Sequence, residues 1–263
     1  MASEPIPAAT ILLLRDGPGA LEVLMIERHP NTAFASGALV FPGGKLAAED
    51  ADAGWTGHVD GRFDTPERAL RIAAIREAFE ETGLLLARPR EARGDGAALA
   101  GADRAAPLEP FREPVNAGEA SFLKLIADAQ LVLALDALVY FAHWITPERL
   151  PKRFDTHFYV AIAPPEQSEL CDGGEAVEAC WMTPKAALAA EAERRRRVMF
   201  PTRMNLELLA GAGSASEAMA RAAARPVVTV LPKVELEDGA PMLVIPPDAG
   251  YSLSRAPFDP ARD

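Results

Sequence analysis

Residues 76–83 read R-E-A-F-E-E-T-G and bring three carboxylates, Glu77, Glu80 and Glu81, close together. On an α-helix, which turns about 100° per residue, Glu81 lies about 40° to one side of Glu77 and Glu80 about 60° to the other. The acids therefore share one face, while Phe79 and the apolar residues before it fall on the opposite face, which predicts packing against a core. Neighbouring carboxylates repel one another, and a divalent cation would relieve this repulsion because hard ions take oxygen ligands.

The helix that carries this face has its own start and stop signals. Thr65 can cap it, with Pro66 at its first position, and Gly83 ends it. Upstream, the apolar run 38–41 leads into Pro42-Gly43-Gly44, where the glycines let the backbone approach a ligand and expose a carbonyl. This arrangement favours a metal site; the alternative is a solvated acidic helix face without a ligand.

Gly-Gly, a connector and then R-E-x-x-x-E-E-x-G resembles the Nudix box, the signature of the Nudix hydrolases. The spacing departs from the family pattern, because Gly44 and Arg76 lie 32 positions apart, an insertion of 18. The inserted residues, about 50–64, are rich in Gly and Asp and predict a surface loop that leaves the Gly44 carbonyl facing the acids. The carboxylate that replaces the first box glutamate stays open between Asp50, Asp64 and Glu67.

An insertion at this place, followed by A-L-R-I-A-A-I-R-E-A-F-E-E, resembles the branch of the family that contains the peroxisomal coenzyme A diphosphatase. The similarity continues in L-L-L-A-R-P-R and R-F-D-T-H-F-Y-V-A, to about residue 210. The resemblance implies Mg²⁺- or Mn²⁺-dependent hydrolysis of coenzyme A or acyl-coenzyme A to 3′,5′-ADP and (acyl-)phosphopantetheine. Two alternatives stay open: a nucleoside diphosphate-sugar or dinucleotide pyrophosphatase, and a non-catalytic Nudix-fold binding module, against which the intact glutamates count.

The resemblance also implies roles for the residues of the box. Glu77, Glu81 and the Gly44 carbonyl are implied metal ligands, and Glu80 is a ligand or a group just behind the ligands. Arg76 lies four residues before Glu80 and can brace its carboxylate on the same helix face. The alternative for Arg76 is an exposed helix salt bridge without a catalytic role.

The general base is sought in a later loop, D-G-G-E, that ends at Glu175. Glu175 lies six residues before Trp181, a spacing that resembles the extra acidic ligand or base of some Nudix enzymes. A loop glutamate in water is the alternative interpretation, and Asp172 and Glu178 are rivals in the same segment.

Arginines outside the box are candidates for binding substrate phosphates. Arg153 precedes a predicted strand and could hold a phosphate bidentately; a charge at the strand edge is the alternative. The run from Arg194 to Arg197 could meet an extra phosphate, such as the 3′-phosphate of coenzyme A, or could be a solvated helix end favoured by the helix dipole. No metal-like spacing relates the four histidines, His29, His58, His143 and His157, and none is assigned a role.

The net charge of −11 argues against binding of a nucleic acid polymer, whose phosphates need a basic surface. A metal can still supply positive charge locally for a small-molecule diphosphate. The chain has no run of 18 apolar residues, starts without the basic region of a signal peptide, and ends in P-A-R-D rather than in a peroxisomal address. These features favour a cytoplasmic enzyme that does not bind membranes.

The remaining patterns predict an α/β protein, and the resemblance implies an α/β/α sandwich with a mixed central sheet, C-terminal helices and a short β-prone tail. Apolar runs predict strands at 8–14, 21–26, 38–41, 84–87, 138–145, 154–162 and 176–182. Helices are expected at 65–82 and 116–135, from 183 to the four arginines, from 201, and from 214. We expect a Nudix domain at 1–212, with a surface excursion at 88–114, and a C-terminal extension at 213–263 that adds to the sheet or forms a homodimer.

Overall fold

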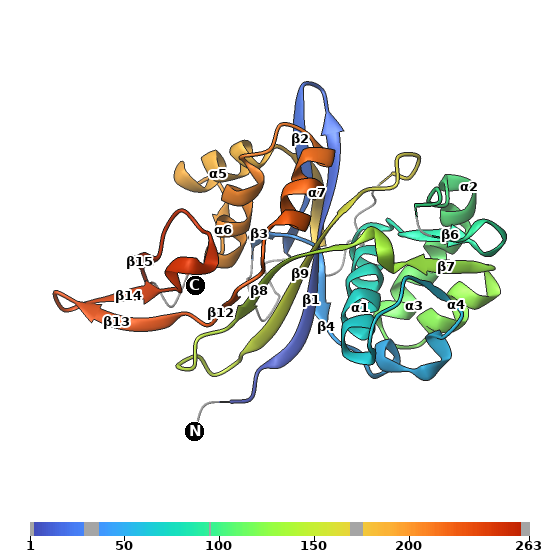
Figure 1. The fold of residues 1–263 in the computed structure, drawn as a ribbon, viewed down its shortest axis with the longest axis horizontal. Coiled ribbons are helices and arrows are strands. Elements are labelled where there is room, and N and C mark those ends of the chain that lie inside the picture. The colour runs from blue at the N-terminus through green and yellow to red at the C-terminus, as the bar shows by residue number, and fades with distance from the viewer. Residues whose placement is uncertain (1–2, 29–36, 95, 169–175, 259–263) are drawn as a thin grey trace.

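A computed structural model describes residues 3–28, 37–94, 96–168 and 176–258. A nine-stranded mixed sheet runs through its centre in the order β11-β3-β2-β1-β9-β8-β12, with β10 paired to β2 and β4 paired to β1 (Figure 1). The strands are β1 (Ile6–Gly17), β2 (Ala20–Arg28), β3 (Ala38–Val40), β4 (Gly43–Lys45), β8 (Val139–Ile145), β9 (Phe154–Ile162), β10 (Ala176–Met182), β11 (Arg197–Val198) and β12 (Thr229–Val230). Parallel pairing of β1 with β9 and antiparallel pairing of β1 with β2 make the sheet mixed.

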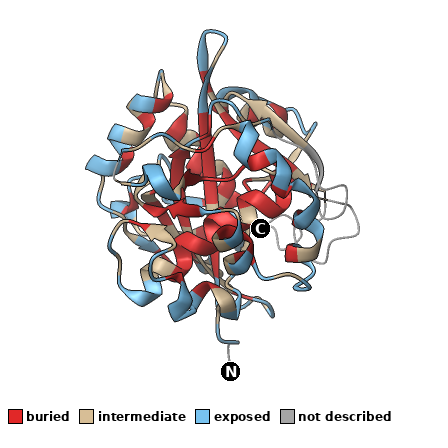
Figure 2. Cartoon of the chain, turned by 90° about the vertical axis from the view of Figure 1, so that its right-hand side faces the viewer, coloured by how far each residue is buried: buried red, intermediate tan, exposed pale blue. Residues whose placement is uncertain are grey.

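Helices cover both faces of this sheet (Figure 1). On one face lies α1 (Thr65–Thr82), and on the other lie α5 (Pro184–Ala192), α6 (Phe200–Leu209) and α7 (Ala215–Ala224). Because both faces are covered, successive residues of β1 are buried: Ile11 packs on the α1 side and Leu12 on the opposite side. Figure 2 shows the buried interior running along the sheet. The α/β/α sandwich is confirmed.

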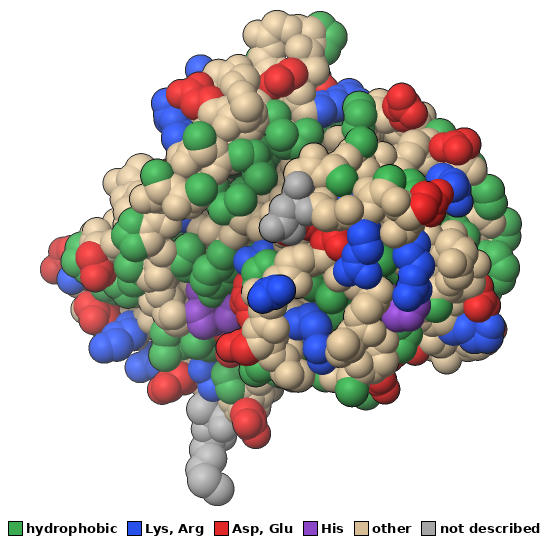
Figure 3. All heavy atoms as spheres, turned by 45° about the vertical axis from the view of Figure 1, so that its right-hand side comes forward, with side chains coloured by type: hydrophobic (Ala, Val, Ile, Leu, Met, Phe, Trp, Pro, Cys, Tyr) green, Lys and Arg blue, Asp and Glu red, His purple; other side chains and the backbone are tan. Residues whose placement is uncertain are grey.

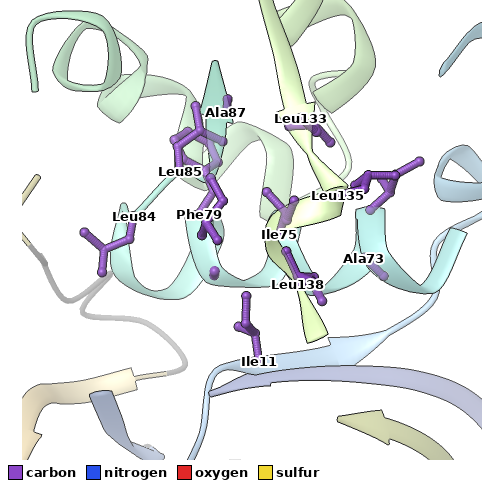
Figure 4. Packing of buried hydrophobic residues seen from close by; sticks show 14 of the residues in the cluster. Ile11, Ala73, Ile75, Phe79, Leu84, Leu85, Ala87, Leu133, Leu135 and Leu138 are labelled. Carbon is purple, nitrogen blue, oxygen red and sulfur yellow. The ribbon is translucent and has the colours of Figure 1, made fainter. Parts of the chain in front are cut away.

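Helix α1 packs its apolar face as predicted. Ile75 and Phe79 point into a buried cluster with Leu85, Leu133 and Ile11 (Figure 4). Asp64 caps the helix, one residue earlier than expected, because its carboxylate accepts a hydrogen bond from the Glu67 amide at 3.0 Å. Gly83 ends the helix at φ 77°, a left-handed conformation that favours glycine. The apolar face is thus fixed on the core, and the acidic face is left for β4.

The insertion at 50–64 is not a plain surface loop, which corrects the prediction. Trp55 is fully buried, its ring lies 5.8 Å from that of Phe122, and its indole Nε1 donates to the Glu49 carbonyl at 2.9 Å. Asp60 is also buried, and it accepts hydrogen bonds from Arg88 at 3.1 Å and from Arg93 at 2.9 Å. The insertion supplies β5 (Val59–Asp60) to a second sheet of order β5-β7-β6, with β6 (Ala87–Pro89) and β7 (Leu131–Ala134). Trp55, a large aromatic residue within a Gly- and Asp-rich run, anchors this segment in the buried cluster on the α1 side of the sheet.

Two further predictions near this small sheet, the helix at 116–135 and the surface excursion at 88–114, differ from the structure. The helix expected at 116–135 is shorter, α4 (Phe122–Asp128), and Gln130 at φ 54° turns the chain from this helix into β7. The excursion at 88–114 contains α2 (Ala102–Ala105) and is partly buried, because the Arg112 guanidinium donates to the Glu80 carbonyl at 3.0 Å. Arg112 lies in α3 (Arg112–Asn116) and satisfies carbonyls at the C-terminal end of α1.

The strand expected at 84–87 begins only at Ala87, where β6 starts, and the other elements lie close to their predicted positions. The β1–β2 hairpin and the bounds of β9 and β10 agree with the prediction. After residue 212, α7 begins at its cap Ser214, and β12 pairs with β8, so this part of the chain joins the central sheet. A third sheet follows, with β13 (Lys233–Glu237), β14 (Ala240–Val244) and β15 (Arg255–Pro257). Short 3-10 helices lie at Ala48–Ala51, Ala53–Trp55, Arg90–Ala92, Ala106–Phe111, Leu135–Ala137 and Pro247–Ala249. In the part of the chain that the structure describes, no helix has the length and apolarity to cross a bilayer.

Candidate active site

The acidic face of α1 lies directly against the glycines of β4. The Gly43 amide donates to Glu81 Oε2 at 2.8 Å. At Gly44, an added Cβ would lie 2.5 Å from the carboxyl oxygens of Glu77, so a larger residue would have to displace the Glu77 carboxylate that Arg76 holds. As predicted, the inserted residues leave the glycines of β4 next to the acids of α1.

Arg76 is buried in the centre of a carboxylate network, which rules out the exposed salt bridge. Its Nε and Nη2 donate to the two oxygens of Asp50 at 3.0 and 2.9 Å. Its Nη1 donates to Glu77 Oε1 at 2.9 Å and to both oxygens of Glu80 at 3.1 Å. Burial by itself lowers the pKa of Arg76, but the hydrogen bond to Asp50 and the charges of Glu77, Asp50 and Glu80 raise it overall, so the guanidinium stays charged. Arg76 thus fixes the positions of three acids.

The structure also distinguishes the candidates for the first box glutamate. Asp50 is 1% exposed, and besides Arg76 it accepts a hydrogen bond from the Ala47 amide at 2.8 Å. Asp64 is occupied in capping α1, and Glu67 pairs with Arg71 at 2.7 Å. Asp50 is the candidate that faces Arg76.

This donor set fits a hard divalent cation. Glu80 and Glu81 are 3% and 5% exposed, and Gly44, Glu77 and Glu80 line one cleft. Burial raises the pKa of Glu77 to about 7; the charge of Arg76 opposes this shift and that of Glu80 adds to it. Carboxylate and carbonyl oxygens are the ligands that Mg²⁺ and similar ions prefer.

The raised pKa predicts a pH dependence of folding in metal-free protein. The unfolded chain releases the Glu77 proton near pH 4.5, whereas the folded protein keeps it up to about pH 7. The stability from the neutral carboxyl is therefore present below about pH 4.5 and lost as the pH rises to about 7. Urea unfolding in EDTA would measure the free energy of unfolding of wild type and of Glu77→Gln at two pH values. We expect the wild-type value to fall, relative to that of Glu77→Gln, by on the order of 2 kcal/mol between pH 5 and pH 8. If the difference in free energy of unfolding between the two proteins did not change with pH, Glu77 would not have a raised pKa in the folded protein.

A cleft of about 1000 Å³ extends from these carboxylates. One part of its lining is polar and comes from the connection between α3 and α4, including Asn116 and Ser121. Another part is apolar and crosses the sheet to the start of α6 and to β14; it includes Phe41, Trp144, Phe154, Phe158, Phe200 and Leu243. The cleft therefore offers a polar part and an apolar part next to the carboxylates.

The predicted substrate arginines are not among the described residues that line this cleft. Arg153 is buried, and its guanidinium donates to the carbonyls of Thr146 at 3.0 Å and Ser3 at 2.8 Å, which corrects its placement at the substrate. Arg194 is exposed just after α5 with φ 58°, and Arg197 lies in β11 beside β3. Glu175 and its rival Asp172 lie outside the described residues.

Sequence reasoning missed other basic residues of the cleft. Lys45, Lys152 and Arg28 contribute to its lining, and Arg28 Nη1 lies 3.8 Å from Glu81 Oε1. Lys45 directly follows the paired glycines and Lys152 precedes Arg153, so adjacency to those motifs could have identified both. Which side chain of Lys152-Arg153 faces the cleft depends on strand geometry, which the sequence did not resolve.

The fold and the cluster of glutamates beside paired glycines define a Nudix-type protein. Residues 59–204, more than half of the chain, match the family model described as NUDT19 Nudix domain, and the chain belongs to this family. It is 32% identical over 205 residues to the human acyl-coenzyme A diphosphatase NUDT19, covering 63% of this chain and 54% of that protein. For the chicken protein of the same name the identity is 31% over 234 residues, covering 69% and 61%.

A solved NUDIX hydrolase from Alicyclobacillus acidocaldarius has a similar fold. Its TM-score is 0.68 at 26% identity, covering 85% of this chain and 99% of that one. By contrast, the chain spans only about half to three fifths of the length of the curated relatives that it matches. The family and the fold are therefore established, and the activity of the whole protein is a proposal.

Proposed function

We propose that this protein is a metal-dependent Nudix diphosphatase that hydrolyses coenzyme A or acyl-coenzyme A to 3′,5′-ADP and (acyl-)phosphopantetheine. The observation that carries the proposal is the cluster of Glu77, Glu80 and Glu81 against Gly43-Gly44 in a cleft with polar and apolar linings. The names of the curated relatives, acyl-coenzyme A diphosphatases, support the choice of substrate. An aromatic lining suits the pantetheine arm and an acyl chain, whose burial is favourable.

In this proposal Glu77, Glu81 and the Gly44 carbonyl hold Mg²⁺ or Mn²⁺. When bound, such an ion neutralises phosphate oxygens and activates water. The remaining work is done by groups of the chain. Arg76 keeps both Glu80 and Glu77 oriented toward the cleft, since its Nη1 donates to each carboxylate. Glu80, held through both of its oxygens, acts as a further ligand or positions the ligands beside it.

Hydrolysis consumes one water molecule for each diphosphate. The water oxygen forms a bond to one phosphorus, the bridging P–O bond breaks, and its electron pair leaves on the oxygen of the other phosphate. The water proton passes to a carboxylate, for which Glu175 remains the candidate from sequence. The metal-binding carboxylates and the buried Arg76 would lower the barrier by positioning and by neutralising charge.

Recognition of the 3′-phosphate of coenzyme A tests the proposed substrate. A hydrogen bond to a charged group contributes about 1.5–3 kcal/mol, so we expect kcat/KM for coenzyme A to exceed that for dephospho-coenzyme A by roughly ten- to a hundred-fold. Lys152, exposed at the cleft, is the cation that we assign to this phosphate. Lys152→Ala should narrow the gap, whereas Lys124→Ala, an exposed lysine paired with Asp128 on α4, should leave it unchanged.

Three outcomes would change this proposal. Equal kcat/KM on coenzyme A and dephospho-coenzyme A would show that the protein does not recognise the 3′-phosphate. The ratio of kcat/KM for coenzyme A to that for dephospho-coenzyme A could instead fall in a folded Arg153→Ala or Arg194→Ala variant and stay unchanged in Lys152→Ala. That result would assign the 3′-phosphate to the arginines. Higher kcat/KM on ADP-ribose or a nucleotide sugar would favour the alternative pyrophosphatase.

A further inference from the structure

Two histidines and an aspartate that sequence spacing did not relate meet on the central sheet. His143 of β8 lies opposite His157 of β9, and their rings stack with centroids 4.1 Å apart. Asp155, two residues before His157, lies on the same face of β9. Its Oδ1 is 2.5 Å from His143 Nε2 and 3.7 Å from His157 Nε2. The three potential ligand atoms all lie within 4.8 Å of one another.

The other nitrogen of each ring is held by a hydroxyl. His143 Nδ1 lies 2.8 Å from Thr229 Oγ1, and His157 Nδ1 lies 2.9 Å from the Tyr140 hydroxyl. In the metal-free protein His143 Nε2 carries a proton and donates it to Asp155, because a carboxylate only accepts. A metal would replace this proton, while each hydroxyl accepts a hydrogen bond from Nδ1–H. Both Nε2 atoms face the same carboxylate oxygen. Metal-binding histidines characteristically have their second nitrogen held in this way, which fixes the ring orientation and the tautomer.

The surroundings allow an ion to enter. The side chains of His143, His157 and Asp155 are 15%, 19% and 33% exposed, so the cluster is recessed but open to solvent. Histidine side chains reach the surface next to acidic ones on the face shown in Figure 3.

The cluster is separate from the carboxylate site. Trp144, Thr156 and Phe158, which alternate with the cluster residues along β8 and β9, line the cleft. Since successive side chains of a strand point to opposite faces, the cluster lies on the face that α1 covers. There it neighbours Tyr140, whose ring contacts Tyr159, and the Tyr159 hydroxyl donates to Glu67 in the first turn of α1. Glu77 lies ten residues further along the helix, about 15 Å at the rise of an α-helix. The inference therefore stands independently of the proposed diphosphatase activity.

We propose that His143, Asp155 and His157 bind a transition-metal cation such as Zn²⁺, through two imidazole Nε2 atoms and one carboxylate oxygen. Imidazole ligands suit Zn²⁺, Co²⁺ and Ni²⁺, whereas Mg²⁺ prefers oxygen ligands alone. Three protein ligands leave a coordination position for water. Because Thr229 belongs to β12, bound metal would also tie the C-terminal part of the chain to β8 and β9.

Metal binding can be measured on full-length, chelator-stripped protein in the presence of saturating Mg²⁺. We expect about one equivalent of Zn²⁺ by equilibrium dialysis, and a visible d–d absorption band with Co²⁺. Both signals should persist in Glu81→Gln, which weakens the carboxylate site. They should weaken at least about tenfold in His143→Ala and His157→Ala but not in His58→Ala, a control at a histidine outside the cluster. Tyr140→Phe, which removes only the hydroxyl, should weaken binding about tenfold.

The outcomes separate a metal site from a hydrogen-bonded His–Asp pair. Circular dichroism checks the fold of each variant, and Asp155→Asn provides a milder replacement if an alanine variant does not fold. Zn²⁺ should raise the melting temperature of wild type but not that of a folded His157→Ala. Failure to bind about one equivalent, binding unchanged in the histidine variants, or binding lost in Glu81→Gln would each overturn the proposal.

Discussion

Glu81→Gln is expected to lower turnover at least about tenfold while the fold survives. The loss follows because one missing metal ligand costs one to several kcal/mol of transition-state stabilisation. The amide oxygen of glutamine can still accept the hydrogen bond from the Gly43 amide, which in wild type is 2.8 Å long, so the loop need not move. The variant thus keeps the hydrogen bond to Gly43 and removes the negative charge, together with its attraction to Arg28 at 3.8 Å.

The measurement is kcat at limiting Mg²⁺, with far-UV circular dichroism and melting temperature as checks on the fold. Glu193→Gln is the matched control, because Glu193 is an exposed glutamate whose contact is a surface pair with Arg195. Its turnover should equal that of wild type. A wild-type rate in Glu81→Gln under the same conditions would contradict the site assignment.

Arg76→Gln is expected to reduce the free energy of unfolding by about 3–5 kcal/mol and to abolish most activity. Arg76 neutralises Asp50, which is 1% exposed, and Glu80, which is 3% exposed. Without the guanidinium both carboxylates stay buried with less compensation, and the penalty for an uncompensated buried charge is much larger than the net value of the pair.

Urea unfolding at pH 7 measures this loss. Arg195→Gln, in which the exposed arginine loses only its surface pair, should change stability by no more than about 1 kcal/mol. Adding Asp50→Asn to Arg76→Gln should recover part of the stability, because one buried charge is removed. A loss below about 1 kcal/mol in Arg76→Gln would show that the network is not a structural element of the site.

The helix and its glycine loop could be predicted because their signals are local. Helical spacing placed Glu77, Glu80 and Glu81 on one face, and Gly83 marked the end of α1. The strands β9 and β10 were also predicted with their observed bounds, although the alternation at 154–162 is weak.

The features that were missed depend on contacts between distant segments. Trp55 became a core residue because Phe122, far along the chain, covers it, and composition alone gave a loop. His143 and His157 are related by strand pairing and not by spacing, so the sequence offered no signal for their cluster. Arg153 and Lys152 are adjacent, but Arg153 is buried whereas Lys152 lines the cleft. This difference depends on which of the two side chains turns inward just before β9.

The central claim is that this chain cleaves the diphosphate of coenzyme A, and identification of the products by mass tests it most directly. Purified protein with Mg²⁺ or Mn²⁺ would be offered coenzyme A, acyl-coenzyme A, ADP-ribose and a nucleotide sugar in parallel. We predict 3′,5′-ADP and (acyl-)phosphopantetheine from the first two at the highest kcat/KM, with no product in EDTA. Preferred cleavage of ADP-ribose or the nucleotide sugar, or no turnover of any diphosphate by metal-loaded protein, would contradict the claim.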